Sequence, residues 1–242
     1  MTYIQYVCQG KSDKIIWFFN KSQRFYPLRR NEYKLNWLKK KKFTLMARPI
    51  SKIENGRQTA AHLVAIARKH FKTRGYSSTA LEDIAKEAGL TRGAVYHHFD
   101  GKKGLFLAVF TDAQADIAKR LIKIDKSQLS IWDRFIACNR AFLEACLDSE
   151  LQRIVLIDAP AVLGWDIWRK VDEEKTLGIL RSHLEELIDK GMIKPLPLEP
   201  LTHAISGANN EALLWIAQSS DQKKAFDEAL STIYEFLWSL RK

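Results

Sequence analysis

The polar side chains of residues 91–103 are of the types that bind a polyanion. Hydroxyl, guanidinium, imidazole and ammonium groups follow one another there, on Thr91, Arg92, Tyr96, His97, His98, Lys102 and Lys103. Such groups hydrogen-bond to phosphate oxygens and to base edges in the major groove of DNA. The alternative is an ordinary helical hairpin whose charged face is solvated, and the neighbouring residues favour the first interpretation.

The residues before this stretch predict a helix and a tight turn. Thr79 stands three residues before Glu82, which is the spacing of a capping box at a helix start. An apolar face at helical spacing follows, made by Leu81, Ile84, Ala85 and Ala88. Gly89 can end this helix in the left-handed conformation, and Thr91 can cap a second helix. The two helices and their turn make a helix-turn-helix. The second helix is expected to turn inward Ala94, Val95 and Phe99.

This segment resembles the N-terminal DNA-binding domain of TetR-type transcriptional repressors. The matching positions are Ile84-Ala85, Ala88-Gly89, Thr91, Tyr96, His98-Phe99 and Lys102. The likeness covers about residues 54–112 and includes an amphipathic segment from Thr59 to Arg74 that Gly75-Tyr76 closes. One position departs from the pattern. The family usually has threonine where this chain has Ala80, so one phosphate contact is either absent or taken by Thr79.

The resemblance implies an all-α fold in which residues 46–112 form a three-helix DNA-binding domain. The residues expected to meet DNA are Thr79, Thr91, Arg92, Gly93, Ala94, Tyr96, His97 and Lys102. Among these residues, the family's phosphate-contacting positions are matched by Thr91, Tyr96, His97 and Lys102. Phosphate contacts fix the orientation of the protein on DNA without reading its sequence. Arg92 lies where base edges are read and can pair with a guanine, and Gly93 can permit a close approach of the backbone to DNA. For His98, both a DNA contact and a buried histidine bonded to the main chain remain open.

The first helix of this domain is expected from about Arg57 to Arg74. Its inner stripe consists of Ala60, Leu63, Val64, Ala67 and Phe71. Its outer face is basic and carries Arg57, Arg68, Lys69, Lys72 and Arg74. A run of charges on a helix is usually a solvated face, so none of these side chains is assigned to DNA individually.

The net charge of +11 is unevenly distributed along the 242 residues. Residues 1–45 contain 11 lysines and arginines against two acidic residues, and residues 46–108 contain 11 against five. Residues 109–242 contain 17 against 21, so this part of the chain is mildly acidic. Such a division is typical of a protein of which only one end meets a polyanion.

Residues 1–45 form a basic N-terminal extension with no sustained helical or strand period. Aromatic residues are mixed with lysines there, and the run Lys39–Lys42 precedes Met46-Ala47-Arg48-Pro49, which reads like a natural start. One interpretation is therefore that residues 1–45 are translated upstream sequence. The other is a disordered basic arm that adds phosphate contacts or reaches the minor groove.

Residues 113–242 are predicted to be a helical domain, which in TetR-like proteins binds a small effector and dimerises. We call the predicted DNA-binding domain, residues 46–112, the reader. The helices expected from its end onward are 104–124, 129–148, 150–158, 166–190, 200–219 and 222–240, with a break at Asp158-Ala159-Pro160. Aromatic side chains would suit a cavity for a small apolar or aromatic effector. The candidate ligand residues are Trp132, Trp165, Trp168 and His183, although tryptophans at helical spacing are also typical of a core.

The last two helices are the predicted homodimer interface. Small residues on the first of them would let another helix come close, namely Ala204, Gly207, Ala208 and Ala212. The final helix has a broad apolar face of Phe226, Ala229, Leu230, Ile233, Phe236, Leu237 and Leu240. Two such helices from each subunit form a four-helix bundle. Packing within one chain explains the same pattern.

The remaining signals argue against other classes of protein. No nucleophile elbow, phosphate-cradling glycine loop or metal-ligand spacing occurs, so we expect no catalysis, cofactor or metal. No apolar run reaches the roughly 18 residues of a membrane span, and three cysteines favour the cytoplasm. The predicted function is a homodimeric repressor that a small molecule releases from a double-stranded DNA operator. An activator of the same family and a non-specific architectural protein are the alternatives.

Overall fold

The computed structural model describes residues 5–8, 15–18, 50–145 and 147–242, in two units that divide after Ile50. In the first unit, β1 (Gln5–Cys8) pairs antiparallel with β2 (Ile15–Phe18), with Gln5 opposite Phe18. Each strand is only four residues long, so the pair does not contradict the expectation of no sustained strand period in residues 1–45. Most of residues 1–45 lie outside the residues that the structure describes, so the choice between a basic arm and translated upstream sequence stays open.

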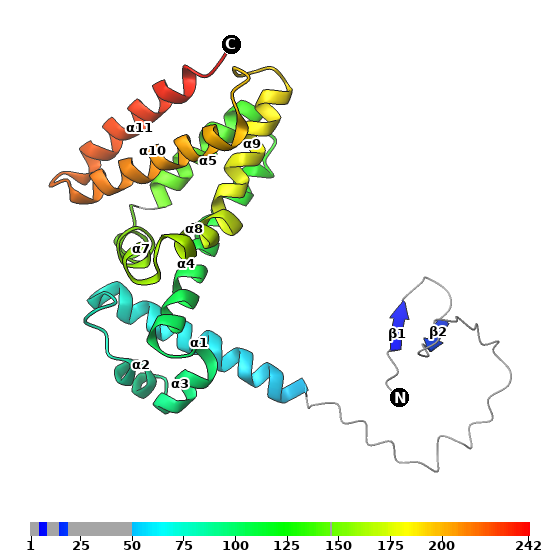
Figure 1. The fold of residues 1–242 in the computed structure, drawn as a ribbon, viewed down its shortest axis with the longest axis vertical. Helices are drawn as coiled ribbons and strands as arrows, with labels where there is room; N and C mark the ends of the chain where they lie inside the picture. The colour runs from blue at the N-terminus through cyan, green and yellow to red at the C-terminus, as the bar shows by residue number, and fades with distance from the viewer. Residues whose placement is uncertain (1–4, 9–14, 19–49, 146) are drawn as a thin grey trace. The chain divides into compact units, whose positions relative to one another are not determined.

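The second unit, Ser51–Lys242, is helical, which confirms the all-α fold class for this part of the chain (Figure 1). Its N-terminal helices are α1 (Ile50–Arg74), α2 (Leu81–Glu87), α3 (Arg92–Phe99) and α4 (Lys102–Asp125). Helix α1 begins upstream of the expected Arg57. The expected three-helix reader is thus present, and α4 continues from it into the rest of the fold.

One face of helix α4 is buried along most of its length because it packs against both halves of this unit. Its apolar stripe is completely covered at Leu105, Phe106, Val109, Phe110, Ala113 and Ile117. On the reader side, the Phe106 ring meets Phe71 of α1 edge to face at 5.0 Å between centroids. The predicted inner stripe of α1 is confirmed at its centre, where Leu63, Ala67 and Phe71 are fully buried.

The C-terminal part contains nine consecutive helical segments among the described residues. They are α5 (Ile131–Ala145), α6 (Ser149–Leu151), η1 (Gln152–Asp158), α7 (Ala159–Leu163), α8 (Trp165–Asp172), η2 (Glu173–Leu177), α9 (Gly178–Asp189), α10 (Leu198–Gln218) and α11 (Gln222–Trp238). Segments η1 and η2 are short stretches of π-helix, of seven and five residues, within otherwise continuous helices. Helices α10 and α11 form an antiparallel pair far from α2 and α3 (Figure 1). No helix in the described ranges is both long and apolar enough to cross a bilayer.

The predicted break at Asp158-Ala159-Pro160 is wrong, because the helix continues to Leu163 and ends at Gly164, whose φ is 88°. In η1 the bonds run to the fifth preceding residue, as in the bond from the Ala159 N–H to the Ile154 carbonyl. Proline has no N–H to continue this series to Val155. The indole N–H of Trp168 fills the gap by donating to the Val155 carbonyl at 2.8 Å.

The apolar face of α11 is used within the chain. Its covered residues are Phe226, Ala229, Leu230, Ile233 and Leu237. They join the two hydrophobic clusters that hold the C-terminal helices together. Intrachain packing, the alternative explanation of this pattern, therefore accounts for the face, whereas Phe236 and Trp238 stay exposed.

Candidate functional site

The turn between α2 and α3 has the conformation that the sequence predicts. Gly89 adopts a left-handed φ of 66°, and the Leu90 N–H bonds back to the Ala85 carbonyl at 2.9 Å. The Thr91 hydroxyl accepts a hydrogen bond from the Ala94 N–H at 3.3 Å, so Thr91 is the N-cap of α3. The first turn of α3 is fixed by this cap, which sets the direction of every side chain on its outer face.

Thr79 does not cap α2, and the capping-box prediction is wrong. The N-cap is Ala80, which makes no side-chain bond. The Thr79 hydroxyl instead donates to the Gly75 carbonyl at 2.7 Å, and the residue is only 2% exposed. Its role here is to hold the turn between α1 and α2, and its hydroxyl does not face outward toward a phosphate.

The outer face of α3 presents Arg92, Gly93, Tyr96 and His97, all exposed. The Arg92 guanidinium is 2.8 Å from the Glu82 carboxylate on α2 and donates to the Tyr96 hydroxyl at 3.3 Å. These contacts hold two side chains with DNA-binding chemistry side by side. A Cβ on Gly93 would meet only the Thr91 hydroxyl, at 3.7 Å, so nothing within the chain requires glycine there.

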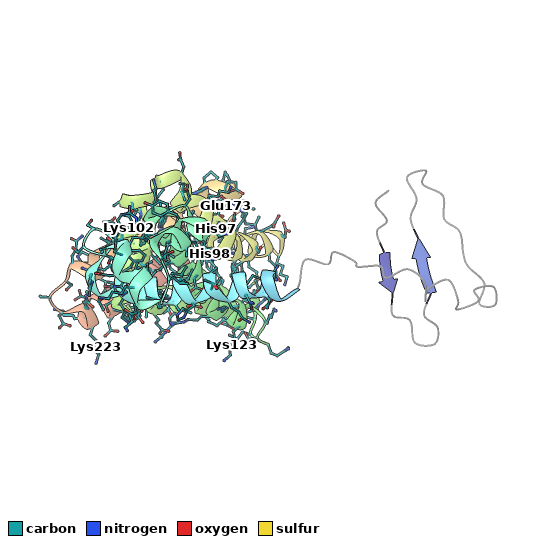
Figure 2. All side chains as sticks on the ribbon, turned by 90° about the horizontal axis from the view of Figure 1, so that it is seen from below. His97, His98, Lys102, Lys123, Glu173 and Lys223 are labelled. Carbon is teal, nitrogen blue, oxygen red and sulfur yellow. The ribbon has the colours of Figure 1, made fainter. Side chains whose placement is uncertain are left out.

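Two further residues of α3, Ala94 and His98, are less exposed than this outer face. Ala94 is half-buried beside the fully buried Val95, which agrees with the predicted inward face. His98 is also half-buried, and its ring lies 5.4 Å from that of exposed His97. Figure 2 looks onto this end of the molecule, with both histidines labelled. Among the described residues, no three histidine, cysteine or acidic side chains gather as metal ligands would.

Lys102 begins α4 and lies against the turn that follows α1. Its ammonium group is 4.3 Å from the centre of the Tyr76 ring and donates to the Ser77 carbonyl at 3.4 Å. Burial lowers the pKa of Lys102 below its usual value. The structure therefore brings Lys102 to the same end as α3, as Figure 2 shows, but folds its side chain onto the protein.

Arg68 of α1 is not on a solvated face, contrary to the prediction. Its guanidinium contacts Asp112 at 2.7 Å and Asp116 at 2.6 Å on α4, and also bonds the Glu150 carboxylate on α6. Burial alone would lower the pKa of Arg68, but its hydrogen bonds to these carboxylates outweigh burial and raise it. One side chain thus ties the reader to α4 and to the C-terminal helices.

The π-helix η1 makes a second connection, to the end of α1. The Arg153 guanidinium donates to the Lys72 and Thr73 carbonyls at 3.3 and 3.2 Å. The Asp158 carboxylate accepts from the Tyr76 N–H at 2.9 Å. Sequence analysis missed this connection, because residues about 80 positions apart carry no local signal of their contact.

A small cavity lies among α4, α5, α8, η2, α9 and α10. Its free space is about 40 Å³. The lining residues are Leu121, Cys138, Asn139, Phe142, Asp172, Thr176, Leu177, Ile179, Leu180, His183, Ser206 and Asn209. Of the four predicted ligand residues, only His183 belongs to this wall.

The three candidate tryptophans do not line this cavity, and their part in ligand binding stays a prediction. Trp168 is buried through its bond to Val155 and stacks on Trp165, with ring centroids 4.9 Å apart. Trp165 itself is 62% exposed. Trp132 is buried in the core cluster beside Phe135. The core interpretation therefore holds for Trp132 and Trp168.

The cavity wall contains three organised polar groups. Asn209 donates to the Asn139 side-chain oxygen at 2.9 Å, and His183 Nε2 is 2.7 Å from the Asp125 carboxylate at the end of α4. Asp172 bonds to Thr176 at 2.6 Å and to Arg169 at 2.9 Å, and burial raises the pKa of Asp172 above its usual value. Because Asp125 and Leu121 belong to α4, the wall is directly connected to the helix that reaches the reader.

Two family models match the chain in the regions just described. Residues 63–109 match "Bacterial regulatory proteins, tetR family", and residues 132–240 match "Tetracyclin repressor-like, C-terminal domain". The first covers the reader and the second covers the helices around the cavity.

Known proteins show the same likeness. The crystal structure of a TetR-family transcriptional regulator from Pectobacterium atrosepticum is 36% identical, with a TM-score of 0.67 over 78% of this chain and 96% of that one. The Transposon Tn10 TetC protein of Escherichia coli is 27% identical over 64% of this chain and 78% of its own length. The regulator AcrR of Shigella flexneri is 38% identical, but the match spans only 27% of this chain and 31% of AcrR.

Proposed function

Because the chain belongs to the TetR family of transcriptional regulators, we propose that it is a homodimeric repressor released from its operator by a small molecule. The observation that carries this proposal is the placement of the capped, exposed face of α3 and the cavity at opposite ends of α4. Helix α4 begins two residues after α3 and ends at Asp125 against His183. One rigid element thus joins the two candidate sites.

On DNA, we assign α3 to the major groove. Thr91, Tyr96 and His97 contact phosphates, and Arg92 reads a base edge beside Gly93, where the backbone approaches closely. Lys102 joins the phosphate contacts by leaving the Tyr76 ring. Thr79 is left out of this set, because its hydroxyl is buried and bonded to the Gly75 carbonyl.

The first test compares Arg92→Ala with Lys223→Ala in operator binding. Both changes remove one positive charge from an exposed position, but Lys223 lies on α11, away from α3 (Figure 2). We expect Arg92→Ala to reduce the preference for specific over random DNA by about tenfold to a hundredfold, because a bidentate contact to guanine is lost. Titrations against both DNAs at two salt concentrations measure this ratio.

The control has a definite expectation. Lys223→Ala should leave both the preference and the salt dependence of binding unchanged. Equal losses in the two variants would mean that only net charge matters, as in an architectural protein with little sequence preference. That result would remove α3 as the sequence reader.

For the dimer, we propose the exposed stripe of α10 together with neighbouring α11. Ala204, Gly207, Glu211 and Trp215 recur at helical spacing and are exposed. Small residues at the first two positions let a second helix approach closely, and exposed Trp215 and Phe236 offer apolar surface. This interface uses the side of the helix pair that intrachain packing leaves uncovered.

The interface is tested by Gly207→Arg. A Cβ at Gly207 meets no atom within 4 Å, so the monomer accommodates a side chain there. We expect the long charged side chain to hold the partner helix away and convert the dimer to monomer. Analytical ultracentrifugation measures this, with Glu185→Arg on the exposed face of α9 as control. A Gly207→Arg dimer as tight as the wild type would rule out this stripe.

Release follows from linkage between the two sites. A ligand that prefers the conformation in which the two readers are wrongly spaced must weaken DNA binding by its differential affinity. Leu121 and Asp125 bring α4 to the cavity wall, so a ligand that moves this wall acts on the helix that carries α3. Arg68 and Arg153 tie the other elements of the reader to the same movement.

A further inference from the structure

Two buried polar atoms of the cavity residues have no hydrogen-bond partner among the described protein groups. They are Oδ1 of Asn209 and Nδ1 of His183. The two residues are only 4% and 3% exposed, and both line the cavity. Buried polar atoms in folded proteins are almost always hydrogen-bonded, so two such atoms on one wall point to a ligand that supplies the bonds.

The neighbouring bonds determine that Asn209 offers an acceptor. The Phe135 carbonyl can only accept, so the group of Asn139 that meets it at 2.8 Å must be the amide nitrogen. The Asn139 oxygen then faces Asn209 and accepts from its nitrogen at 2.9 Å. This leaves the Asn209 oxygen as the free atom. Exchanging the amide nitrogen and oxygen of Asn139 would place its oxygen against the Phe135 carbonyl oxygen, and two acceptors cannot bond to each other.

His183 offers an acceptor for a similar reason. Its Nε2 is 2.7 Å from the Asp125 carboxylate, which accepts hydrogen bonds. In the neutral ring the proton therefore lies on Nε2, and Nδ1 keeps a lone pair. Both free atoms thus require a donor from the ligand.

The other lining residues indicate that the ligand has an apolar body and no negative charge. Leu121, Phe142, Leu177, Ile179 and Leu180 give it an apolar surface. The lining contains no lysine or arginine, and its carboxylate, Asp172, is already bonded to Thr176 and Arg169. An anionic ligand would find two acceptors and a carboxylate, which repel it.

We propose that the effector is an uncharged molecule with an apolar or aromatic body and a hydroxyl group that donates to Asn209 or His183. This inference rests on the proposed function of the cavity as the effector site. The free space of about 40 Å³ holds about three water molecules, so the ligand must widen the cavity. Widening at His183 acts on Asp125, the last residue of α4.

The test uses phenol, anisole and benzoate as probes of the full chain. They share one ring and differ in offering a donor, no donor or a negative charge. We expect phenol to bind about tenfold more tightly than anisole, because anisole leaves the acceptors unpaired, and benzoate to bind more weakly than either. Dissociation constants come from NMR titration at one fixed pH for all three probes.

Two variants locate the effect. Because the single hydroxyl donates to one acceptor, His183→Phe or Asn209→Leu should reduce the ratio of anisole to phenol dissociation constants, and Ser182→Ala, an exposed neighbour of His183, should leave it unchanged. His183→Phe keeps a ring in place and leaves Asp125 paired with Arg134, so it serves if Asn209→Leu fails to fold. An unchanged ratio in His183→Phe and Asn209→Leu would overturn the assignment.

The outcomes also separate the inference from the proposed function. Anisole or benzoate binding as tightly as phenol, or no binding by any of the three, overturns the ligand chemistry. Operator binding by the same preparations without any probe is measured in parallel. Loss of operator binding would count against the proposed function. If operator binding is present but the three probes do not bind as expected, the result counts only against the proposed class of ligand.

Discussion

Replacing Gly104 with alanine is expected to disrupt the reader and abolish operator binding. An alanine Cβ at this position would lie 1.6 Å from the Phe99 carbonyl oxygen, a main-chain atom that cannot rotate away. Because α3 ends at Phe99 and α4 contains Gly104, the two helices must separate to admit a methyl group. We expect a loss of about 4 kcal/mol or more, at the upper end of overpacking effects.

Gly93→Ala is the matched control, since it makes the same chemical change one helix earlier. Its Cβ would meet only the Thr91 hydroxyl at an ordinary 3.7 Å, and alanine is favoured over glycine in a helix by about 1 kcal/mol. We therefore expect Gly93→Ala to be as stable as the wild type or slightly more so. The melting temperature of Gly104→Ala should fall by about 10 °C or more.

Circular dichroism melting and operator titration check these expectations together. If Gly104→Ala melted within a degree or two of the wild type, α4 would not lie as close to the Phe99 carbonyl as described here. Loss of operator binding by the stable Gly93→Ala would in addition support the proposed close approach of DNA at that position.

The second large effect is expected for Arg68→Met, which keeps a long side chain and removes its charge. Three carboxylates, on Asp112, Asp116 and Glu150, would then face one another without their shared partner. Breaking a fully buried pair costs about 3–5 kcal/mol, and since Arg68 and Asp112 are partly exposed we expect about 2 kcal/mol. Chemical denaturation at neutral pH measures this loss.

The control for this change is Arg74→Met. Arg74 pairs with Asp83 at 2.8 Å, but half of each side chain is exposed, and surface pairs contribute at most about 1 kcal/mol. We expect the stability of Arg74→Met to stay close to that of the wild type. Equal losses for the two arginines would mean that Arg68 is no more than a surface charge.

The Arg68 effect should also depend on pH. Burial acts to raise the pKa of Asp116, but hydrogen bonds from Lys119 and Arg68 outweigh it, so the pKa of Asp116 is lower than usual. A lowered carboxyl pKa stabilises the folded chain above the unfolded value of about 4, and this contribution is lost as the pH falls through the lowered pKa. The stability difference between wild type and Arg68→Met should therefore narrow below about pH 4.

Local signals in the sequence were sufficient for the helix-turn-helix. Gly89 and Thr91 act on their immediate neighbours, so their conformations follow from residue type. Thr79 fails under the same kind of reasoning, because its hydroxyl chooses the Gly75 carbonyl in the preceding turn over the N-terminus of α2. A capping residue has more than one nearby acceptor or donor, and tertiary packing decides among them.

Positions that depend on distant partners were not predictable in this way. Arg68 has the pattern of a solvated helix face until α4 and α6 supply its carboxylates. The cavity is lined by Asn139 and Asn209 from helices 70 residues apart, and the more conspicuous tryptophans go to the core or the surface. Periodicity indicates which side of a helix is covered, but it does not say whether a gap remains beneath.

The bond between Trp168 and the Val155 carbonyl makes two distant sequence positions depend on each other. Proline at position 160 deprives that carbonyl of its main-chain partner, and the indole restores it. A descendant of this chain that exchanged Pro160 for a residue with an N–H would no longer need the indole. Conversely, loss of Trp168 alone would leave the carbonyl unpaired. The two positions are therefore expected to change together as the sequence diverges, although neither belongs to the proposed DNA contacts or lines the cavity.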